Sequence, residues 1–223
     1  MNKFDMHLQK LLRVTPDLVE NYQNLKNILF QHLKIPKKTD LATLGFGGYG
    51  TVFWLPDKSK VLKITEDHSD AYACEIVRKK PDKNLIKIYS VFSFGLPYFE
   101  EHYGIVAEKL TPLSASEVSE WEDVIDVVRG HTDLKIPPLR FLDLAWCEAT
   151  KSAMSAQPSY TYEPVFSKYF PILEDWAKLL ESHGIEWGDL SVNNIMKRGP
   201  TFLIADLGAG YVSRQTVESL EID

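Results

Sequence analysis

Three oxygen-bearing side chains in the last fifth of the chain constrain its function most strongly. Asp189 and Asn194 lie five positions apart, and Asp206 follows twelve residues after Asn194 in an Asp-Leu-Gly sequence. The apolar run 201–205 that precedes Asp206 is typical of a short buried strand. An Asp–Asn pair at this spacing is common by itself, so its meaning depends on the residues upstream.

These residue types suit phosphoryl transfer. The reaction needs a group that orients the acceptor hydroxyl and oxygen ligands that hold Mg²⁺ against the phosphates. Carboxylate and amide oxygens are ligands that Mg²⁺ accepts readily. We therefore expect Asp189 to accept or orient the proton of the acceptor, and Asn194 and Asp206 to bind Mg²⁺.

The same pattern resembles the catalytic loop and the Asp-Phe-Gly segment of protein kinases, with Leu207 in place of the phenylalanine. The resemblance implies ATP and Mg²⁺ as cofactors. It also implies that a glycine-rich loop and a phosphate-binding lysine lie upstream, in that order.

A glycine-rich segment does occur there. Gly45, Gly47, Gly50 and Val52 have the spacing of the kinase loop, in which glycines let backbone N–H groups approach phosphates. The same glycines would also suit a plain hairpin turn. A dinucleotide-binding fold would require a helix directly after them, whereas residues 51–55 are rich in strand-forming residues. The resemblance implies nucleotide contacts from Gly45, Phe46, Gly47, Gly48, Tyr49, Gly50 and Val52.

Lys63 lies thirteen residues after Gly50 in the alternating segment Lys60-Val61-Leu62-Lys63-Ile64-Thr65. A lysine in an apolar strand is often an edge residue that extends to water. The resemblance instead implies that Lys63 binds the α- and β-phosphates of ATP. Its partner would be a glutamate on the next helix, expected over residues 66–79. Glu75 is the favoured candidate and Glu66 the alternative.

Two more strands are expected after Pro81, over residues 84–94 and 98–108, which completes five strands with one helix after the third. Glu108 and Leu110 then correspond to the kinase hinge. Main-chain atoms of such a hinge contact adenine, so the side chains there carry little information.

Residues 1–40 are expected to form a helical extension. Apolar residues recur at helical spacing from Phe4 to Leu12 and again from Leu18 to Leu33. These helices could brace the sheet that follows, or they could bind a partner or a second copy of the chain.

The region after residue 110 is expected to be mainly helical. Ser114 and Glu117 form a capping box for a helix that Gly130 would end. A second helix is expected over residues 141–154. A third is expected to begin at Pro171 and to end at Gly184, with His183 as a capping or packing residue rather than a base.

Composition excludes several classes of protein. A net charge of −6 and a pI near 5.6 do not suit a nucleic-acid-binding surface. Cys74 and Cys147 lie far apart, so the sequence indicates neither a zinc site nor a disulfide framework. Charges near the N-terminus and the absence of a run of ~18 apolar residues argue against a signal peptide or membrane span. We expect a protein of the cytoplasm, or of a host cytoplasm if it is an effector or phage protein.

The chain also departs from the kinase pattern. Trp187-Gly188 replaces the His-Arg pair before the loop aspartate, and Ser191 lies where Ser/Thr kinases have a lysine. The sequence Gly188-Asp189-Leu190-Ser191 is similar to the loops of RIO-type and aminoglycoside- or choline-type kinases. Only fifteen residues follow Gly208, which implies a shortened C-terminal lobe, as in short phage or bacterial effector kinases.

We therefore expect an α+β, bilobal, kinase-like fold with a helical extension (1–40), an N-lobe with a five-stranded antiparallel sheet (41–110) and a truncated, mainly helical C-lobe (111–223). The expected function is ATP- and Mg²⁺-dependent phosphorylation of serine or threonine in proteins, with this chain itself as one candidate substrate. Phosphorylation of a small molecule and a non-catalytic binding role are the alternatives.

Overall fold

The computed structural model describes residues 3–14, 19–36, 39–46, 50–94, 101–129, 139–155, 163–208 and 211–212. These residues form an α+β protein with a five-stranded antiparallel sheet and six α-helices, which confirms the predicted class and sheet. The chain divides into two compact units. The first holds the N-terminal region up to Arg78 together with Lys87–Lys109, and the second holds Lys79–Ile86 together with Leu110–Leu220.

The first unit is built on the five-stranded sheet, whose strand order is β1-β2-β3-β5-β4. Helix α3 (His68–Lys79) follows the third strand, as predicted. Strands four and five begin four residues later than expected from the sequence. The strands are β1 (Thr43–Phe46), β2 (Gly50–Trp54), β3 (Lys60–Thr65), β4 (Ile88–Phe94) and β5 (His102–Glu108).

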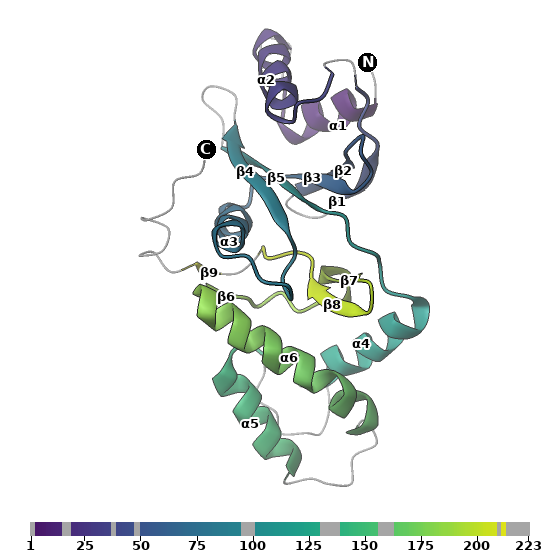
Figure 1. The fold of residues 1–223 in the computed structure, drawn as a ribbon, viewed down its shortest axis with the longest axis vertical. Coiled ribbons are helices and arrows are strands. Elements are labelled where there is room, and N and C mark those ends of the chain that lie inside the picture. Colours follow the sequence, from purple (N-terminus) through teal and green to yellow (C-terminus); the bar gives the residue numbers. More distant parts are fainter. Residues whose placement is uncertain are drawn as a thin grey trace. The chain divides into compact units, whose positions relative to one another are not determined.

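The two N-terminal helices cover one face of this sheet, and α3 lies on the other (Figure 1). Helices α1 (Lys3–Leu11) and α2 (Val19–His32) contribute fully buried side chains to one core with the sheet. The ring of Phe4 contacts that of Phe53 edge to face, with centroids 4.9 Å apart. The prediction that these helices brace the sheet is therefore confirmed, whereas partner binding by them stays a prediction. Other members of the core include Leu8, Tyr22, Leu29, Phe30, Leu62, Ile64 and Val106.

The second unit combines three helices with short strands. The helices are α4 (Ala115–Val128), α5 (Leu144–Ser155) and α6 (Glu163–His183). Strands β7 (Ile195–Arg198) and β8 (Thr201–Ile204) form a hairpin, and β6 (Ile185–Glu186) pairs with β9 (Tyr211–Val212). A short 3₁₀ helix, η2 (Val192–Asn194), precedes β7.

Aromatic rings fill the core of this unit. Trp121 of α4 stacks on Trp176 of α6, with ring centroids 5.5 Å apart and nearly parallel planes. Tyr169 and Phe202 pack against Trp121 from α6 and β8. Large flat rings bury much apolar area, so this cluster joins two helices and the hairpin into one core.

Helix α6 corrects the sequence analysis at its start. The helix begins at Glu163, eight residues before Pro171. Pro171 was predicted to be the first residue of this helix but lies inside it. Proline favours the first turn of a helix because it has no backbone N–H to bond. Buried Phe166, Tyr169 and Phe170 anchor the turns around Pro171, and this packing outweighs the local preference.

The other end of α6 agrees with expectation. The helix ends at His183, directly before Gly184. The ring nitrogens of His183 lie 2.7 Å and 2.8 Å from the carbonyl oxygens of Leu179 and Lys80. The packing role predicted for His183 is therefore confirmed. The helix predicted for residues 141–154 is α5, which begins three residues later, and Gly130 lies outside the described residues.

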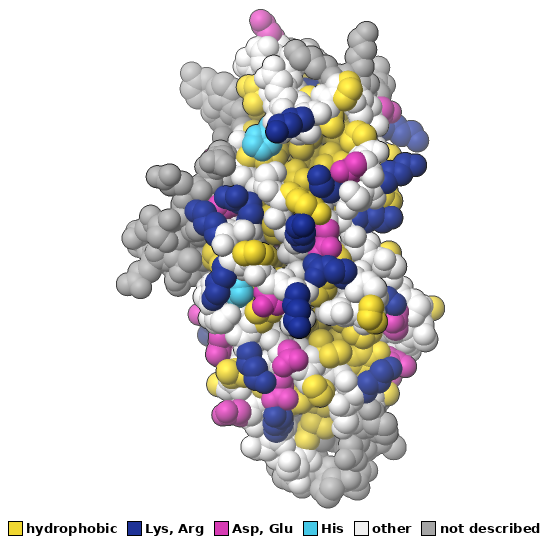
Figure 2. Space-filling model, in the orientation of Figure 1, with side chains coloured by type: hydrophobic (Ala, Val, Ile, Leu, Met, Phe, Trp, Pro, Cys, Tyr) yellow, Lys and Arg dark blue, Asp and Glu magenta, His cyan; other side chains and the backbone are white. Residues whose placement is uncertain are grey.

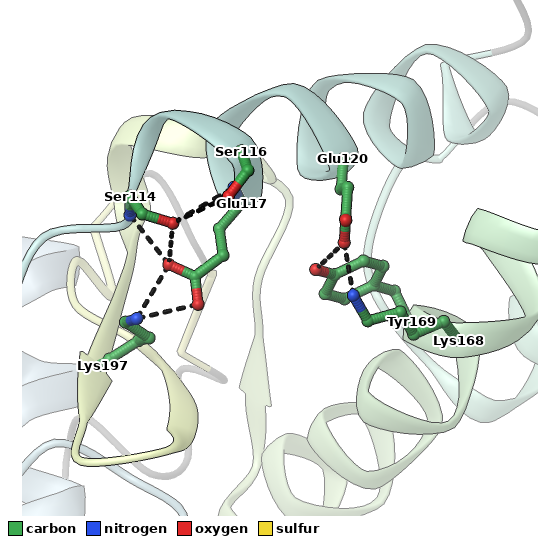
Figure 3. A network of polar contacts seen from close by, with 7 residues as sticks. All are labelled: Ser114, Ser116, Glu117, Glu120, Lys168, Tyr169 and Lys197. Atoms are coloured by element: carbon green, nitrogen blue, oxygen red, sulfur yellow. Dashed lines mark hydrogen bonds and ion pairs between the residues drawn. The ribbon is translucent and has the colours of Figure 1, made fainter.

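Polar contacts fix α4 against its neighbours (Figure 3). The predicted capping box is present, because the Ser114 hydroxyl accepts from the Glu117 backbone and the Glu117 carboxylate accepts from the Ser114 backbone. Both oxygens of that carboxylate also lie 2.8 Å from Nζ of Lys197 in β7. Further along α4, Glu120 accepts hydrogen bonds from Lys168 and Tyr169 of α6. Helix α4 is thus joined to the hairpin and to α6.

The Glu117–Lys197 contact predicts a pH dependence of stability. Hydrogen bonds from Lys197 and then from Ser114 lower the pKa of Glu117 from 4.5 to about 2. A carboxyl group whose pKa is lowered by folding stabilises the fold above its unfolded pKa, and the contribution is lost as the pH falls toward the folded value. Glu117→Gln keeps a capping side chain but removes the ion pair. We expect it to lower the denaturation midpoint at pH 7, with the difference from the parent shrinking between about pH 4.5 and pH 2.

Denaturant titrations across that pH range would measure the effect, with Glu122→Gln, an exposed position on the same helix, as the matched control. A difference between parent and Glu117→Gln that stays constant down to pH 2 would show that the ion pair does not stabilise the fold.

In the described part of the chain, no helix has both the length and the hydrophobicity needed to cross a lipid bilayer.

Candidate functional site

Lys63 lies on the sheet face opposite to α1 and α2. It is directly opposed by Val52 on β2 and by Ile105 on β5. Directly opposed residues of antiparallel strands point to the same face, and so do residues two positions apart on one strand. Val61 and its partner Ala107 therefore share the face with Lys63. The ammonium group thus extends from an apolar surface.

The carboxylate of Asp70 contacts Lys63. Its Oδ2 lies 2.6 Å from Nζ of Lys63, and the Asp70 side chain is only 2% exposed. Asp70 belongs to the first turn of α3, five residues before the predicted partner. A buried ion pair stabilises a protein only when its geometry is good, because the cost of removing both charges from water opposes their attraction. The contact holds Lys63 against the start of α3.

Glu75, the predicted partner of Lys63, has a close contact of its own. Its two carboxylate oxygens accept hydrogen bonds from Nε and Nη2 of Arg78 at 2.6 Å and 2.7 Å. The Glu75 side chain is buried on α3. Sequence reasoning considered only Glu75 and Glu66 and missed Asp70, for which the sequence carried no separate signal.

The glycine-rich segment is described in part. Gly47, Gly48 and Tyr49 lie outside the described residues, while Gly45 and Phe46 end β1 and Gly50 begins β2. A Cβ atom on Gly50 would come within 2.6 Å of the carbonyl oxygen of Ile64. Strand packing therefore gives Gly50 a structural reason to be glycine, beside its predicted role at phosphates. Phe46 is 83% exposed, so its ring is open to contact from a ligand.

The predicted hinge residue Glu108 ends β5 and contacts the start of β4. Its Oε1 accepts a hydrogen bond from the backbone N–H of Lys87 at 2.6 Å, and its own N–H donates to the carbonyl of Lys87. Leu110 is buried in the second unit. Contacts of adenine with this segment stay a prediction.

Asp189 and Asn194 are brought together in the second unit. The Asn194 side-chain nitrogen donates to the Asp189 carbonyl at 2.9 Å and to its carboxylate oxygen Oδ2 at 2.8 Å. Asp189 is exposed. Because Asn194 uses its amide nitrogen here, its amide oxygen is left as the metal ligand that the sequence predicts.

Asp206 lies beside Asn194 at the open end of the β7–β8 hairpin. Ile195 pairs with Ile204, and the next backbone bond runs from the N–H of Ala205 to the carbonyl of Asn194 at 2.8 Å. The carboxylate oxygen Oδ1 of Asp206 accepts from the N–H of Gly208 at 2.9 Å. The hairpin thus places the two predicted metal ligands at adjacent positions, one on each strand end.

Trp187 forms a hydrogen bond with the backbone of Asp206. Its Nε1–H donates to the carbonyl oxygen of Asp206 at 3.1 Å, and its ring is fully buried with its edge against Trp176. Sequence reasoning treated Trp187 only as a departure from the kinase pattern. The structure gives it the role of linking the aromatic core to the Asp206 backbone.

Gly188, between Trp187 and Asp189, passes close to another segment. A Cβ atom at Gly188 would come within 2.5 Å of the carbonyl oxygen of Arg140. Any side chain would force this backbone apart, so the local packing requires glycine at position 188.

The donor set fits a hard cation. Asp189, Asn194 and Asp206 offer carboxylate and amide oxygens without nitrogen or sulfur ligands. Among the residues that the structure describes, no group of three or more His, Cys, Asp or Glu side chains could enclose a metal ion. Mg²⁺ is commonly held by one or two carboxylates and completes its shell with water and substrate phosphates. An all-protein zinc site would require a different set.

The chain was compared with protein-family models and with curated proteins. No family model and no curated protein matches the chain.

The Trp187–Asp206 hydrogen bond can be tested by its effect on stability. Trp187→Phe keeps an aromatic ring but leaves the Asp206 carbonyl without this donor, which we expect to lower the free energy of unfolding by about 1–3 kcal/mol beyond the cost of the smaller ring. Trp121→Phe is the matched control, because the equally buried Nε1 of Trp121 has no hydrogen-bond partner within the described residues. Equal losses for the two variants in chemical denaturation would contradict a stabilising role for the bond.

Proposed function

We propose that this chain is an ATP- and Mg²⁺-dependent phosphotransferase with a bilobal, protein-kinase-like fold, and that it transfers the γ-phosphoryl group to serine or threonine hydroxyls of proteins in the cytoplasm. The observation that carries the proposal is the arrangement at the β7–β8 hairpin, where Asn194 bonds Asp189 and lies beside Asp206. That arrangement resembles the catalytic loop and metal-binding segment of kinases.

In the second unit, Asp189 would accept or orient the proton of the acceptor hydroxyl. Its exposure leaves it accessible to a bulky substrate, and its bonds with Asn194 fix its direction. The amide oxygen of Asn194 and the carboxylate of Asp206 would hold Mg²⁺. When bound, Mg²⁺ would neutralise part of the negative charge on the phosphate oxygens.

In the first unit, Lys63 would bind the phosphates of ATP. Its ammonium group is already held by Asp70, which limits its freedom before ATP arrives. Val52, Val61 and Ala107 share its sheet face and would contact the adenine ring. The glycine-rich segment between β1 and β2 would cover the phosphates.

The experiment that tests this function is incubation of the pure protein with labelled ATP, Mg²⁺ and a cell lysate. Labelled proteins would support the proposal, labelled metabolites would indicate a small-molecule kinase, and no label would indicate a binding module. Asp189→Ala should lower transfer about 10²–10⁴-fold, the range typical for loss of a general base.

Asp175→Ala is the matched control for Asp189→Ala. Asp175 lies on α6 in the same unit, and 72% of its side chain is exposed. Its replacement by alanine removes the same negative charge as Asp189→Ala does. Equal labelling by the parent and Asp189→Ala would show that the role assigned to Asp189 is wrong.

A further inference from the structure

The loop that carries Asp189 is held through its backbone carbonyl groups. The carbonyl of Trp187 accepts from the N–H of Leu142 at 2.8 Å, and that of Ser191 accepts from the N–H of Asn194 at 3.0 Å. The Asp189 carbonyl accepts from the side-chain nitrogen of Asn194 at 2.9 Å. Carbonyl groups in a folded chain need such donors, so the donors determine how the loop is fixed.

The carbonyl of Leu190, the residue after Asp189, takes its donor from a different helix. Nη2 of Arg129 donates to it at 3.3 Å. Arg129 is the C-cap residue of α4, and its own backbone N–H bonds to the carbonyl of Ile125. Leu190 is only 3% exposed, and both residues of the contact belong to the second unit. The contact therefore joins the end of α4 to the buried position next to Asp189.

Helix α4 gives this donor a fixed origin. The two residues directly before Arg129 are Val127 and Val128, and both are buried. Nearer the start of the helix, Glu117 bonds to β7 and Glu120 bonds to α6 (Figure 3). A side chain that leaves a helix held in this way can fix a neighbouring loop precisely.

Charge alone does not explain the position of Arg129. Within the described residues, no carboxylate forms an ion pair with its guanidinium group. On the face that Figure 2 shows, acidic and basic side chains are intermixed over α4 and α6, so the surface charge does not indicate an anionic ligand. The side chain does not cap its own helix either, because it donates to another segment. The hydrogen bond to Leu190 is therefore the contact that needs a purpose.

We propose that Arg129 is a positioning residue for Asp189 and acts through the Leu190 carbonyl. A peptide unit is planar, so a donor that holds its carbonyl fixes the orientation of the whole unit. Asn194 holds the unit that begins at Asp189, and Arg129 holds the next one. Leu190 then has little freedom to rotate, and the Asp189 backbone keeps the orientation that directs its carboxylate to an acceptor hydroxyl. This inference rests on the proposed function.

Arg129→Met removes the donor and keeps an unbranched side chain. We expect it to lower the maximal rate of labelled phosphate transfer about tenfold or more, because a misdirected group loses much of its effect. The KM for ATP, and the affinity for Mg·ATP in calorimetric titration, should stay within about twofold of the parent values, since Arg129 contacts the loop and not the nucleotide. Arg129→Lys keeps a charged donor and should recover most of the rate, because only one N–H is used.

Amide hydrogen exchange measures the state of the loop without any catalysis. The N–H of Asn194, which bonds to the Ser191 carbonyl, should exchange about tenfold or more faster in Arg129→Met than in the parent. The reason is that the loop opens more often when its link to α4 is lost. Amides in the middle of α6 should exchange as they do in the parent.

Lys178→Met is the matched control for Arg129→Met. Lys178 lies on α6 in the same unit, and 58% of its side chain is exposed. Its replacement removes one positive charge but no donor to the loop. The maximal rate, the affinity for Mg·ATP and the exchange of the Asn194 N–H should all stay within about twofold of the parent values.

The inference is overturned if Arg129→Met transfers phosphate at the parent rate, or if it leaves the exchange of the Asn194 N–H unchanged. Weaker binding of Mg·ATP by Arg129→Met would also overturn it, because Arg129 would then act on the nucleotide directly. A parent that transfers no phosphate gives a different result: it refutes the proposed function, and with it the purpose of positioning Asp189.

Discussion

Asp206→Asn should lower phosphoryl transfer about a thousandfold, because Lewis-acid stabilisation by a metal supplies several kcal/mol and each 1.4 kcal/mol changes the rate tenfold. Asparagine retains the oxygen that accepts from the Gly208 N–H, so the turn at 206–208 should persist. The negative charge that holds Mg²⁺ is removed. Initial rates with labelled ATP, measured over a range of Mg²⁺ concentrations, check this result.

Asp143→Asn is the control for this prediction. Asp143 lies in the same unit, and its Oδ1 accepts from the Trp146 N–H in the same way that Asp206 accepts from Gly208. Its replacement should leave the rate within about twofold, as expected for a change away from the site. If Asp206→Asn retained the parent rate at every Mg²⁺ concentration, Asp206 would not be a metal ligand.

Phe4→Ala should lower the free energy of unfolding by about 3–5 kcal/mol. Phe4 is fully buried, stacks on Phe30 and contacts Phe53 of the sheet. Truncation would leave a cavity between α1, α2 and the sheet. Domains are stable by only about 5–15 kcal/mol, so this one side chain carries a large part of the total. Urea or guanidinium titration followed by circular dichroism measures the loss.

Met6→Ala is the matched control, because Met6 lies on the same helix and is 52% exposed. We expect a change within about 0.5 kcal/mol there. Similar stabilities of Phe4→Ala and Met6→Ala would mean that the N-terminal helices are dispensable to the sheet. Removal of residues 1–40 should then also leave a folded protein, whereas our account predicts that the truncated chain does not fold.

Local patterns were predicted well from the sequence. Strand β3 has the bounds that its alternation indicates, and the Ser114–Glu117 capping box forms as expected. In both cases the signal lies within a few consecutive residues. The hairpin that brings Asn194 beside Asp206 was only half foreseen, since β8 was predicted and its partner β7 was not.

Contacts between distant residues were not predictable in the same way. Asp70 was found 2.6 Å from Lys63, and nothing in the composition of α3 favours one carboxylate of the helix over another. The hydrogen bond from Trp187 to Asp206 depends on how an aromatic core fills. The start of α6 was misplaced because buried aromatic side chains outweigh the preference of Pro171 for a first turn. Tertiary packing decides such features, and one sequence does not reveal it.

Calorimetric titration of ATP into the parent, Lys63→Met and Asp206→Asn, each with Mg²⁺ present, tests most directly whether Lys63 and Asp206 contribute to the binding of Mg·ATP. We predict that the parent binds Mg·ATP and that each single replacement weakens binding by about tenfold or more, because each removes a charged contact with the nucleotide or its metal. Equal affinity in all three proteins, or no binding by the parent, would contradict the proposed function.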